Sequence, residues 1–234
     1  AETRAWRPSE GLLCRTRPAR KWVGWAVSCA AQPDRQTYYI AALIELTLLR
    51  LSTDPDASEQ DIVSVAERAI SVFDAIADHS ASAKAWKLLA IDDLFQHRER
   101  RGIERLEQAL VHAVLADDAR EQAEIRFWIG LAIYQGPMAA EDGMVRIEKL
   151  FPRGNGPYEE AHRFAFLATL KGLCGRFEEA RGLSEQASAL YRELGAQLLV
   201  AGIANLSGPI ELLAGDAVEA ERILQQAYDA LGEM

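Results

Sequence analysis

The sequence predicts an all-α fold, a right-handed α-solenoid of about five helical hairpins. Apolar residues recur at steps of three and four along most of the chain, the period of a helix with one buried face. Glycine, proline and aspartate interrupt this period at regular intervals. The stretch 167–187 also returns at 207–227. Three matched pairs of small residues lie 40 residues apart: Gly175 and Gly215, Ala180 and Ala220, Ala187 and Ala227.

Composition narrows the function classes. The chain has 234 residues and a net charge of −9, which argues against generic nucleic-acid binding because that needs a basic face. No apolar run approaches the ~18 residues of a membrane span, so we expect no membrane contact. The three cysteines are far apart and form no Cys-x-x-Cys pair, which favours a reduced, cytoplasmic setting.

Residues 1–35 differ from the remainder. They hold seven arginines and lysines against three acidic residues, and three of the five tryptophans. No helical or strand period persists there, so we interpret 1–35 as a basic linker or remnant, partly ordered at best. Two alternatives are a secretion signal from Arg20 to Ala31, and a basic-aromatic arm for nucleic acid or an anionic surface. The repeat domain then spans 36–234.

The first predicted hairpin joins a helix over 38–51 to one that opens at Ser58. The first helix is apolar nearly all round, and 52–57 is a break containing a proline. Ser58 and Asp61 form an approximate capping box. The second helix has an apolar stripe at helical spacing: Ile62, Val65, Ala66, Ala69, Ile70, Phe73 and Ile76.

The next two hairpins follow a turn at 78–80. We predict helices over 85–95 and 102–115, joined by a polar turn at 96–101. Asp92-Asp93 and Asp117-Asp118 are interpreted as turn, cap and solvated-face residues, with the second pair capping the following helix. That helix ends at Gly136-Pro137, and its partner covers 139–150.

The stretch 151–157 is the strongest interruption, and Pro157 suits the first turn of a helix. Four helices follow, at about 158–174, 176–194, 197–214 and 217–232. Asp216-x-x-Glu219 caps the last of them. The count is about ten helices with no strand signal.

The hairpins share a spacing. Trp86-x-x-Leu89-Ala90 is followed by Gly102, Phe164-x-x-Leu167-Ala168 by Ala180, and Ala204-x-x-Ser207-Gly208 by Ala220. The small residues let the two helices of a hairpin approach closely. This spacing resembles the tetratricopeptide repeat, whose motif is Trp-x2-Leu-Gly-x2-Tyr … Ala-x3-Phe … Pro. The period is nearer 40 than 34 residues, and the motif tyrosine is replaced by Asp93, Lys171 and Glu211.

A second resemblance lies at the C-terminal end. The run from Leu190 to Leu198, with Leu-Ser-Gly-x-Ile-Glu-Leu-Leu-Ala-Gly-Asp from Leu206, is similar to the helical repeat regions of large bacterial signalling proteins. Those proteins couple an adenylate/guanylate cyclase or a DNA-binding activator domain to a signalling ATPase. The resemblance implies a sensor or scaffold segment of a larger protein. The sequence has no cyclase or ATPase motif, so no activity transfers.

We predict no catalytic residue, no cofactor and no metal. A phosphate-binding Gly-x4-Gly-Lys-Ser/Thr loop is missing, and Arg153 to Gly156 reads as a turn. Glu159-x-x-His162 is half of a di-iron pattern, but the sequence holds no second copy. The other histidines, His79, His97 and His112, show no ligand spacing. Cys174 reads as a small buried or half-buried residue at a turn.

The tetratricopeptide resemblance implies that the first helices of the hairpins line a concave groove. The groove positions lie two before and one after the motif aromatic: Lys84 and Lys87, His162 and Ala165, Gly202 and Asn205, with Arg126 in the third hairpin. The candidate groove-binding residues are Lys84, Lys87, Arg126, His162 and Asn205. Their charge suits an acidic peptide, the C-terminus of a protein or an acidic element of the same polypeptide. The alternative is that the long cations only solvate this face.

These observations predict a scaffold for protein–protein or intramolecular interaction, a regulatory segment of a bacterial signalling protein. One alternative is a small-molecule sensor in which Trp86 and Trp128 stack on a ligand. Another is an enzyme with its site near the 151–157 bend.

Overall fold

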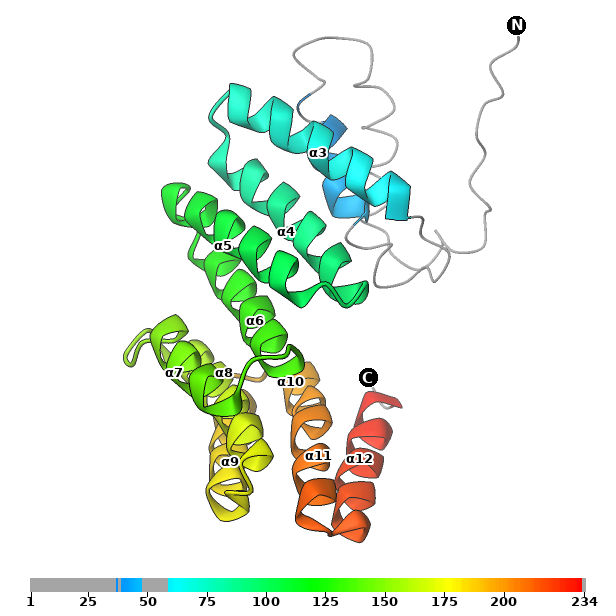
Figure 1. Ribbon diagram of the computed structural model, residues 1–234, viewed down its shortest axis with the longest axis vertical. Coiled ribbons are helices and arrows are strands. Elements are labelled where there is room, and N and C mark those ends of the chain that lie inside the picture. Colours follow the sequence, from blue (N-terminus) through cyan, green and yellow to red (C-terminus); the bar gives the residue numbers. More distant parts are fainter. Residues whose placement is uncertain (1–36, 38, 48–58, 233–234) are drawn as a thin grey trace, which may run out of the picture.

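The computed structural model describes residues 37, 39–47 and 59–232, and this part of the protein is helical without any strand (Figure 1). It confirms the predicted all-α class. A helical segment at 39–47 precedes α3 (Glu59–Ala75). The helices that follow are α4 (His79–Phe95), α5 (Glu99–Leu115), α6 (Ala119–Gln135), α7 (Ala140–Leu150), α8 (Pro157–Leu173), α9 (Phe177–Glu193), α10 (Gln197–Gly202), α11 (Ala204–Ala214) and α12 (Ala217–Gly232). The segment 1–35, the break at 52–57 and the Ser58 cap lie outside the described residues.

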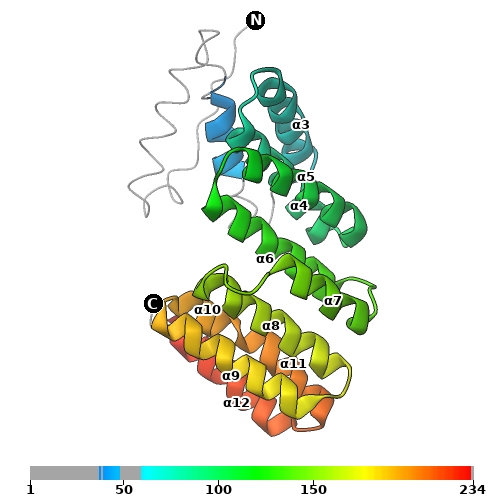
Figure 2. The same ribbon diagram turned by 90° about the vertical axis from the view of Figure 1, so that its left-hand side faces the viewer.

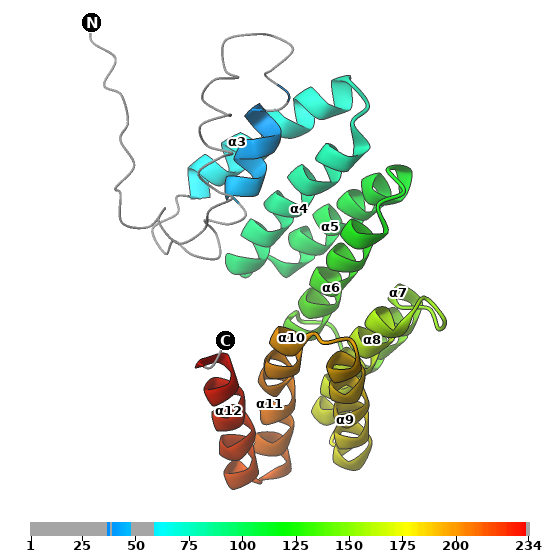
Figure 3. The same cartoon turned by 180° about the vertical axis from the view of Figure 1, so that it is seen from behind.

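Neighbouring helices pack in pairs. α4 packs on α5, α8 on α9 and α11 on α12, and Figure 2 shows the last two pairs stacked below α6. The first helices of successive pairs also meet, because α4 contacts α6, α6 contacts α8, and α8 contacts α11. Figure 3 shows from behind that α10 lies beneath α6 and leads into α11. Contacts therefore link the first helices of successive pairs from α4 to α11.

One turn geometry recurs between the helices. Six residues adopt positive φ between 53° and 87°, in two sets with steps of 20 residues: Ala77, His97 and Asp117, then Gly175, Gly195 and Gly215. The amide of each following residue donates to a carbonyl five residues earlier, for example from Ala196 to Tyr191 at 2.9 Å. This is the Schellman turn, which satisfies the last carbonyls of a helix. The step of 20 is half of the 40-residue repeat seen in the sequence.

Small residues allow close helix crossings, as predicted. A Cβ atom on Gly102 would lie 2.7 Å from Leu94 Cδ2 and 3.3 Å from the Ala90 carbonyl oxygen. Ala168 and Ala180 are both buried and share a cluster with Ile210. These crossings leave no room for larger side chains.

Polar residues at the motif tyrosine position make ion pairs between helices. Asp93 Oδ1 lies 2.6 Å from Arg101 Nη2, and Lys171 Nζ lies 2.8 Å from Glu179 Oε2, each across its own hairpin. Glu211 on α11 instead pairs with Arg181 on α9. Each of these three polar side chains thus links two helices through an ion pair.

The interpretation of Asp92-Asp93 as turn or solvated-face residues is wrong. Both lie inside α4, and Asp93 is 0% exposed. Asp93 accepts hydrogen bonds from Arg98 and Arg101, and Arg105 Nη1 lies 2.7 Å away. The buried carboxylate is stable there because three guanidinium groups surround it.

Several predicted boundaries also shift. α4 begins at His79 rather than residue 85, because Asp78 caps it by accepting from the Ala81 amide at 3.1 Å. α5 begins at Glu99 rather than residue 102. The first turns of both helices contain mostly polar residues, so the apolar periodicity of the sequence did not reveal these helix starts. Ile76, expected in the stripe of α3, follows the helix end and is 55% exposed.

The predicted helix 197–214 is divided into α10 and α11. A tightened turn lies at Ile203, where the Leu206 amide donates to the Ile203 carbonyl at 2.9 Å. Other punctuation is confirmed: Asp118 and Asp216 cap α6 and α12, and Pro157 begins α8.

One segment of the described residues, Gln197–Ala214, is long and apolar enough to cross a membrane by length and composition alone. Its mean hydropathy is 1.3 because Glu211 is its single charged residue. This corrects the expectation that no apolar run approaches the length of a membrane span. The segment contacts α8, α9 and α12, and its composition indicates no compartment.

Candidate functional site

The predicted groove residues Lys84 and Lys87 lie on α4, and both form ion pairs with neighbouring first helices. Lys84 Nζ lies 2.5 Å from Glu45 Oε1 in the 39–47 segment. Lys87 is 3% exposed, and its Nζ lies 2.7 Å from Glu121 Oε1 and 2.9 Å from Glu124 Oε1 on α6. The Lys87–Glu121 contact is an ion pair without hydrogen-bond alignment. Burial raises the pKa of Glu121, and the charge of Lys87 opposes that shift.

Arg126 continues the same pattern from α6 to α8. Its Nη1 lies 2.6 Å from Glu159 Oε1, while Asn155 donates to the other oxygen of Glu159 at 3.0 Å. Each predicted cation of the groove therefore already meets a carboxylate from an adjacent first helix. Binding of an acidic partner stays a prediction, and such a partner would have to displace these carboxylates.

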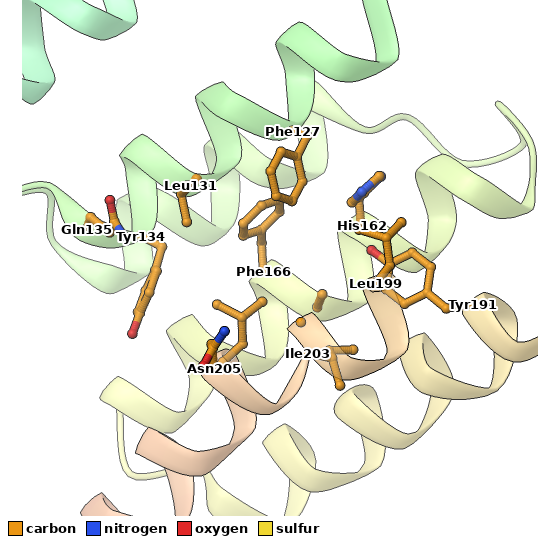
Figure 4. Close-up of a pocket in the computed structure, with 13 residues that line it drawn as sticks. Phe127, Leu131, Tyr134, Gln135, His162, Phe166, Tyr191, Leu199, Ile203 and Asn205 are labelled. Atoms are coloured by element: carbon orange, nitrogen blue, oxygen red, sulfur yellow. The ribbon is translucent and has the colours of Figure 1, made fainter. Parts of the chain in front are cut away.

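A pocket of about 410 Å³ lies between α6, α8, α9 and the α10–α11 segment (Figure 4). It brings together all four groove positions predicted for the last two hairpins: His162, Ala165, Gly202 and Asn205. Its other lining residues are mostly apolar or aromatic: Phe127, Leu131, Tyr134, Gln135, Phe166, Tyr191, Leu199, Ile203 and Leu206. No lining residue is Asp, Glu, Lys or Arg. Lys84, Lys87 and Arg126 lie outside this lining.

Aromatic rings form much of the pocket wall. The Phe127 and Phe166 ring centroids are 5.7 Å apart. In Figure 4 these two rings lie between Tyr134 on one side and His162 with Tyr191 on the other. The His162 and Tyr191 rings are 5.6 Å apart and nearly perpendicular. Such tilted and edge-on contacts are the favoured geometries of aromatic pairs.

His162 is held as a neutral side chain. It is 1% exposed and has the rings of Phe127, Phe151, Tyr158 and Tyr191 within about 6 Å. Burial lowers its pKa to about 4, with slight opposition from the Tyr158 backbone. Its Nδ1 atom makes no hydrogen bond of normal geometry. Near neutral pH the imidazole therefore adds an uncharged ring to the wall.

Two glycines shape the pocket in opposite ways. A Cβ on Gly130 would lie 2.4 Å from Phe166 Cε2, so the Phe166 ring packs directly on the backbone of α6. Gly202 has no atom within 4 Å of a Cβ position, and it lines the pocket. Gly130 thus allows the Phe166 ring to pack against α6 and form the floor of the pocket. Gly202 adds no side chain to the pocket and leaves its volume open.

The remaining candidates from the sequence do not join this site. Cys174 Sγ lies 3.6 Å from Glu141 Oε1, and burial together with that carboxylate raises the pKa of the thiol. His79 and His112 contact each other, with 3.2 Å between their Nδ1 atoms. Across the described residues, no group of three or more His, Cys, Asp or Glu could hold a metal ion. Trp86 and Trp128 pack against the hydrophobic core and do not line the pocket.

Sequence patterns did not reveal the aromatic members of the pocket. Phe127, Phe166 and Tyr191 fall on apolar helix faces and look like ordinary core residues. Repeat alignment identified Gly202 and Asn205 as groove positions, and no sequence signal connected them to α6. That connection depends on how far apart α6 and α10 lie.

No family model matches this protein. No curated protein matches it either.

Proposed function

We propose that this protein is an interaction scaffold, a right-handed tetratricopeptide-like solenoid segment of a larger bacterial signalling protein. It binds a protein partner, or another domain of the same polypeptide, along the face formed by its first helices. We propose a non-catalytic and cytoplasmic role. The observation that carries the proposal is the meeting of groove positions from two hairpins, His162 with Ala165 and Gly202 with Asn205, in one pocket.

Repetition supports an extended binding face. A stack of helix pairs presents its first helices as one continuous surface without a deep catalytic cleft. Where Schellman turns follow one another at steps of 20 residues, they enclose α4, α5 and α9, which have 17 residues each. An apolar pocket on such a face suits anchoring of a side group from a bound segment.

Site-specific photo-crosslinking tests this proposal. Gln135 and Asn205 are exposed and line the pocket, so a photoreactive residue at either position reports on the first-helix face. Gln186 is exposed on the second helix α9 and serves as the matched control. In cells that carry the full-length gene product, we expect one common adduct from Gln135 and Asn205 and none from Gln186. Equal adducts from all three positions, or none, would contradict the proposal.

The pocket volume favours a second candidate, a small-molecule-sensing helical domain. About 410 Å³ falls within the roughly 300–1,000 Å³ of typical ligand sites. A ligand-stability screen tests it: a sensor is stabilised by a compound that has no effect once a bulky residue replaces Gly202.

A further inference from the structure

We infer that the pocket binds one uncharged aromatic ring of phenol or indole type, and that Gly202 keeps the space for this ring open. The inference rests on the proposed function, because the ring belongs either to a residue of the bound partner or to a free small molecule. Both sources share the same chemistry.

The lining requires an uncharged guest. It contains no Asp, Glu, Lys or Arg, and the buried His162 is neutral near physiological pH. A charged ligand would lose its hydration there without a counter-charge. A neutral ring gives up little on leaving water.

The wall chemistry and size favour an aromatic guest. Phe127 and Tyr134 are half-buried and expose part of their rings to the pocket (Figure 4). Phe166 and His162 are buried, and they hold the Phe127 ring by tilted contacts. A planar guest can continue these contacts. The cavity volume suits a one- or two-ring molecule.

Polar groups at the rim can orient the ring. The amides of Gln135 and Asn205 are exposed and also line the pocket. A phenol hydroxyl or indole N–H directed towards the rim would meet a side-chain amide, which both donates and accepts hydrogen bonds. A few placed polar groups beside an apolar wall are typical of ligand pockets.

Gly202 provides the means to test the pocket directly. No atom lies within 4 Å of its Cβ position, and Gly202 lines the pocket, so we expect a Phe or Leu at this position to occupy the cavity. Gly182 on α9 is its matched control, since it also has open space around its Cβ position and does not line the pocket. Gly202→Phe therefore fills the site, and Gly182→Phe changes bulk elsewhere.

The experiment is a fluorine NMR titration of fluoroindole with the 234-residue protein. We expect saturable binding to wild type and Gly182→Phe, and affinity at least about ten-fold weaker for Gly202→Phe and Gly202→Leu. On wild type, fluoroindole carboxylate should bind at least about ten-fold more weakly than fluoroindole, a comparison that needs no folded variant. The inference is overturned by the absence of saturable binding to wild type, by unchanged affinity in the Gly202 variants, or by equal affinity for the carboxylate.

Crosslinking in the Gly202→Phe background distinguishes the two sources of the ring. Loss of the Gln135 and Asn205 adducts in Gly202→Phe assigns the ring to the partner. Retention of these adducts in Gly202→Phe, together with saturable fluoroindole binding to wild type, assigns the ring to a free molecule. Adducts at Gln135 and Asn205 in a protein that does not bind fluoroindole refute the inference about the ring and leave the scaffold proposal standing. Fluoroindole binding without any adduct refutes the scaffold proposal and leaves the inference about the ring standing.

Discussion

Replacing Gly130 with alanine tests how the pocket floor is built. The added Cβ would lie 2.4, 2.6 and 2.9 Å from three ring atoms of Phe166. Ordinary carbon–carbon contacts are about 3.5–4.0 Å, so the ring has to move by roughly 1 Å. Phe166 is fully buried, and its ring centroid lies 6.0 Å from that of Phe151. We therefore expect the Phe166 ring to shift towards the pocket.

The net effect follows from two opposing quantities. Overpacking a core typically costs about 1–3 kcal/mol, and the upper part of that range applies because the clash is with a fully buried ring. Alanine recovers about 1 kcal/mol as the better helix former. We therefore expect Gly130→Ala to lower the free energy of unfolding by about 1–2 kcal/mol, and the melting temperature by roughly 2–8 °C.

Urea denaturation followed by circular dichroism measures this change. Gly202→Ala is the control, because the same substitution in open space should leave stability unchanged or raise it by up to about 1 kcal/mol. In a double-mutant cycle, Phe166→Leu should relieve part of the clash, with an interaction energy of about 1 kcal/mol. A Gly130→Ala variant as stable as wild type, or additive effects of the two substitutions, would refute this account of the floor.

Three further predictions concern stability. Asp93→Ala removes a buried carboxylate among three arginines and should cost about 3 kcal/mol in urea unfolding, whereas Glu185→Ala on the exposed side of α9 should cost little. Ala77→Gly relieves a positive φ of 55° and should raise the melting temperature; an unchanged or lower value would count against strain there. His162 has a pKa near 4 when folded against about 6.5 unfolded, so the unfolded state takes up the proton first and stability falls as pH drops from about 6.5 towards 4. The loss is about 3 kcal/mol and should be absent in His162→Gln, so a pH-independent difference between the two proteins in chemical denaturation would contradict it.

The local structure of this protein was predictable from the sequence. Asp118 and Asp216 signal their helix starts, and Pro157 and Gly136 mark a start and an end. These features depend on residues within a few positions of one another, which is why periodicity and capping rules locate them. The small-residue crossing of Ala90 and Gly102 was also predictable, because the repeat places both at fixed positions.

Side-chain partners were decided only by the tertiary structure. Lys84 pairs with Glu45 39 residues away, and Arg126 with Glu159 33 residues away. The protein has 35 acidic residues, and no spacing rule selects among them. Likewise, the sequence suggested that Asp93 was a surface residue, and only the structure shows that three arginines surround its carboxylate.

The pocket shows the same division. Repeat alignment placed His162 and Asn205 on one face, since equivalent positions of equivalent hairpins point the same way. Their meeting with Phe127 and Tyr191 depends on the separation of α6 from α10, which is set by packing between hairpins. The sequence therefore determined the helices, their caps and the direction of their faces through short-range interactions. Only the tertiary structure decided which faces meet, because that is fixed by contacts between residues far apart in sequence.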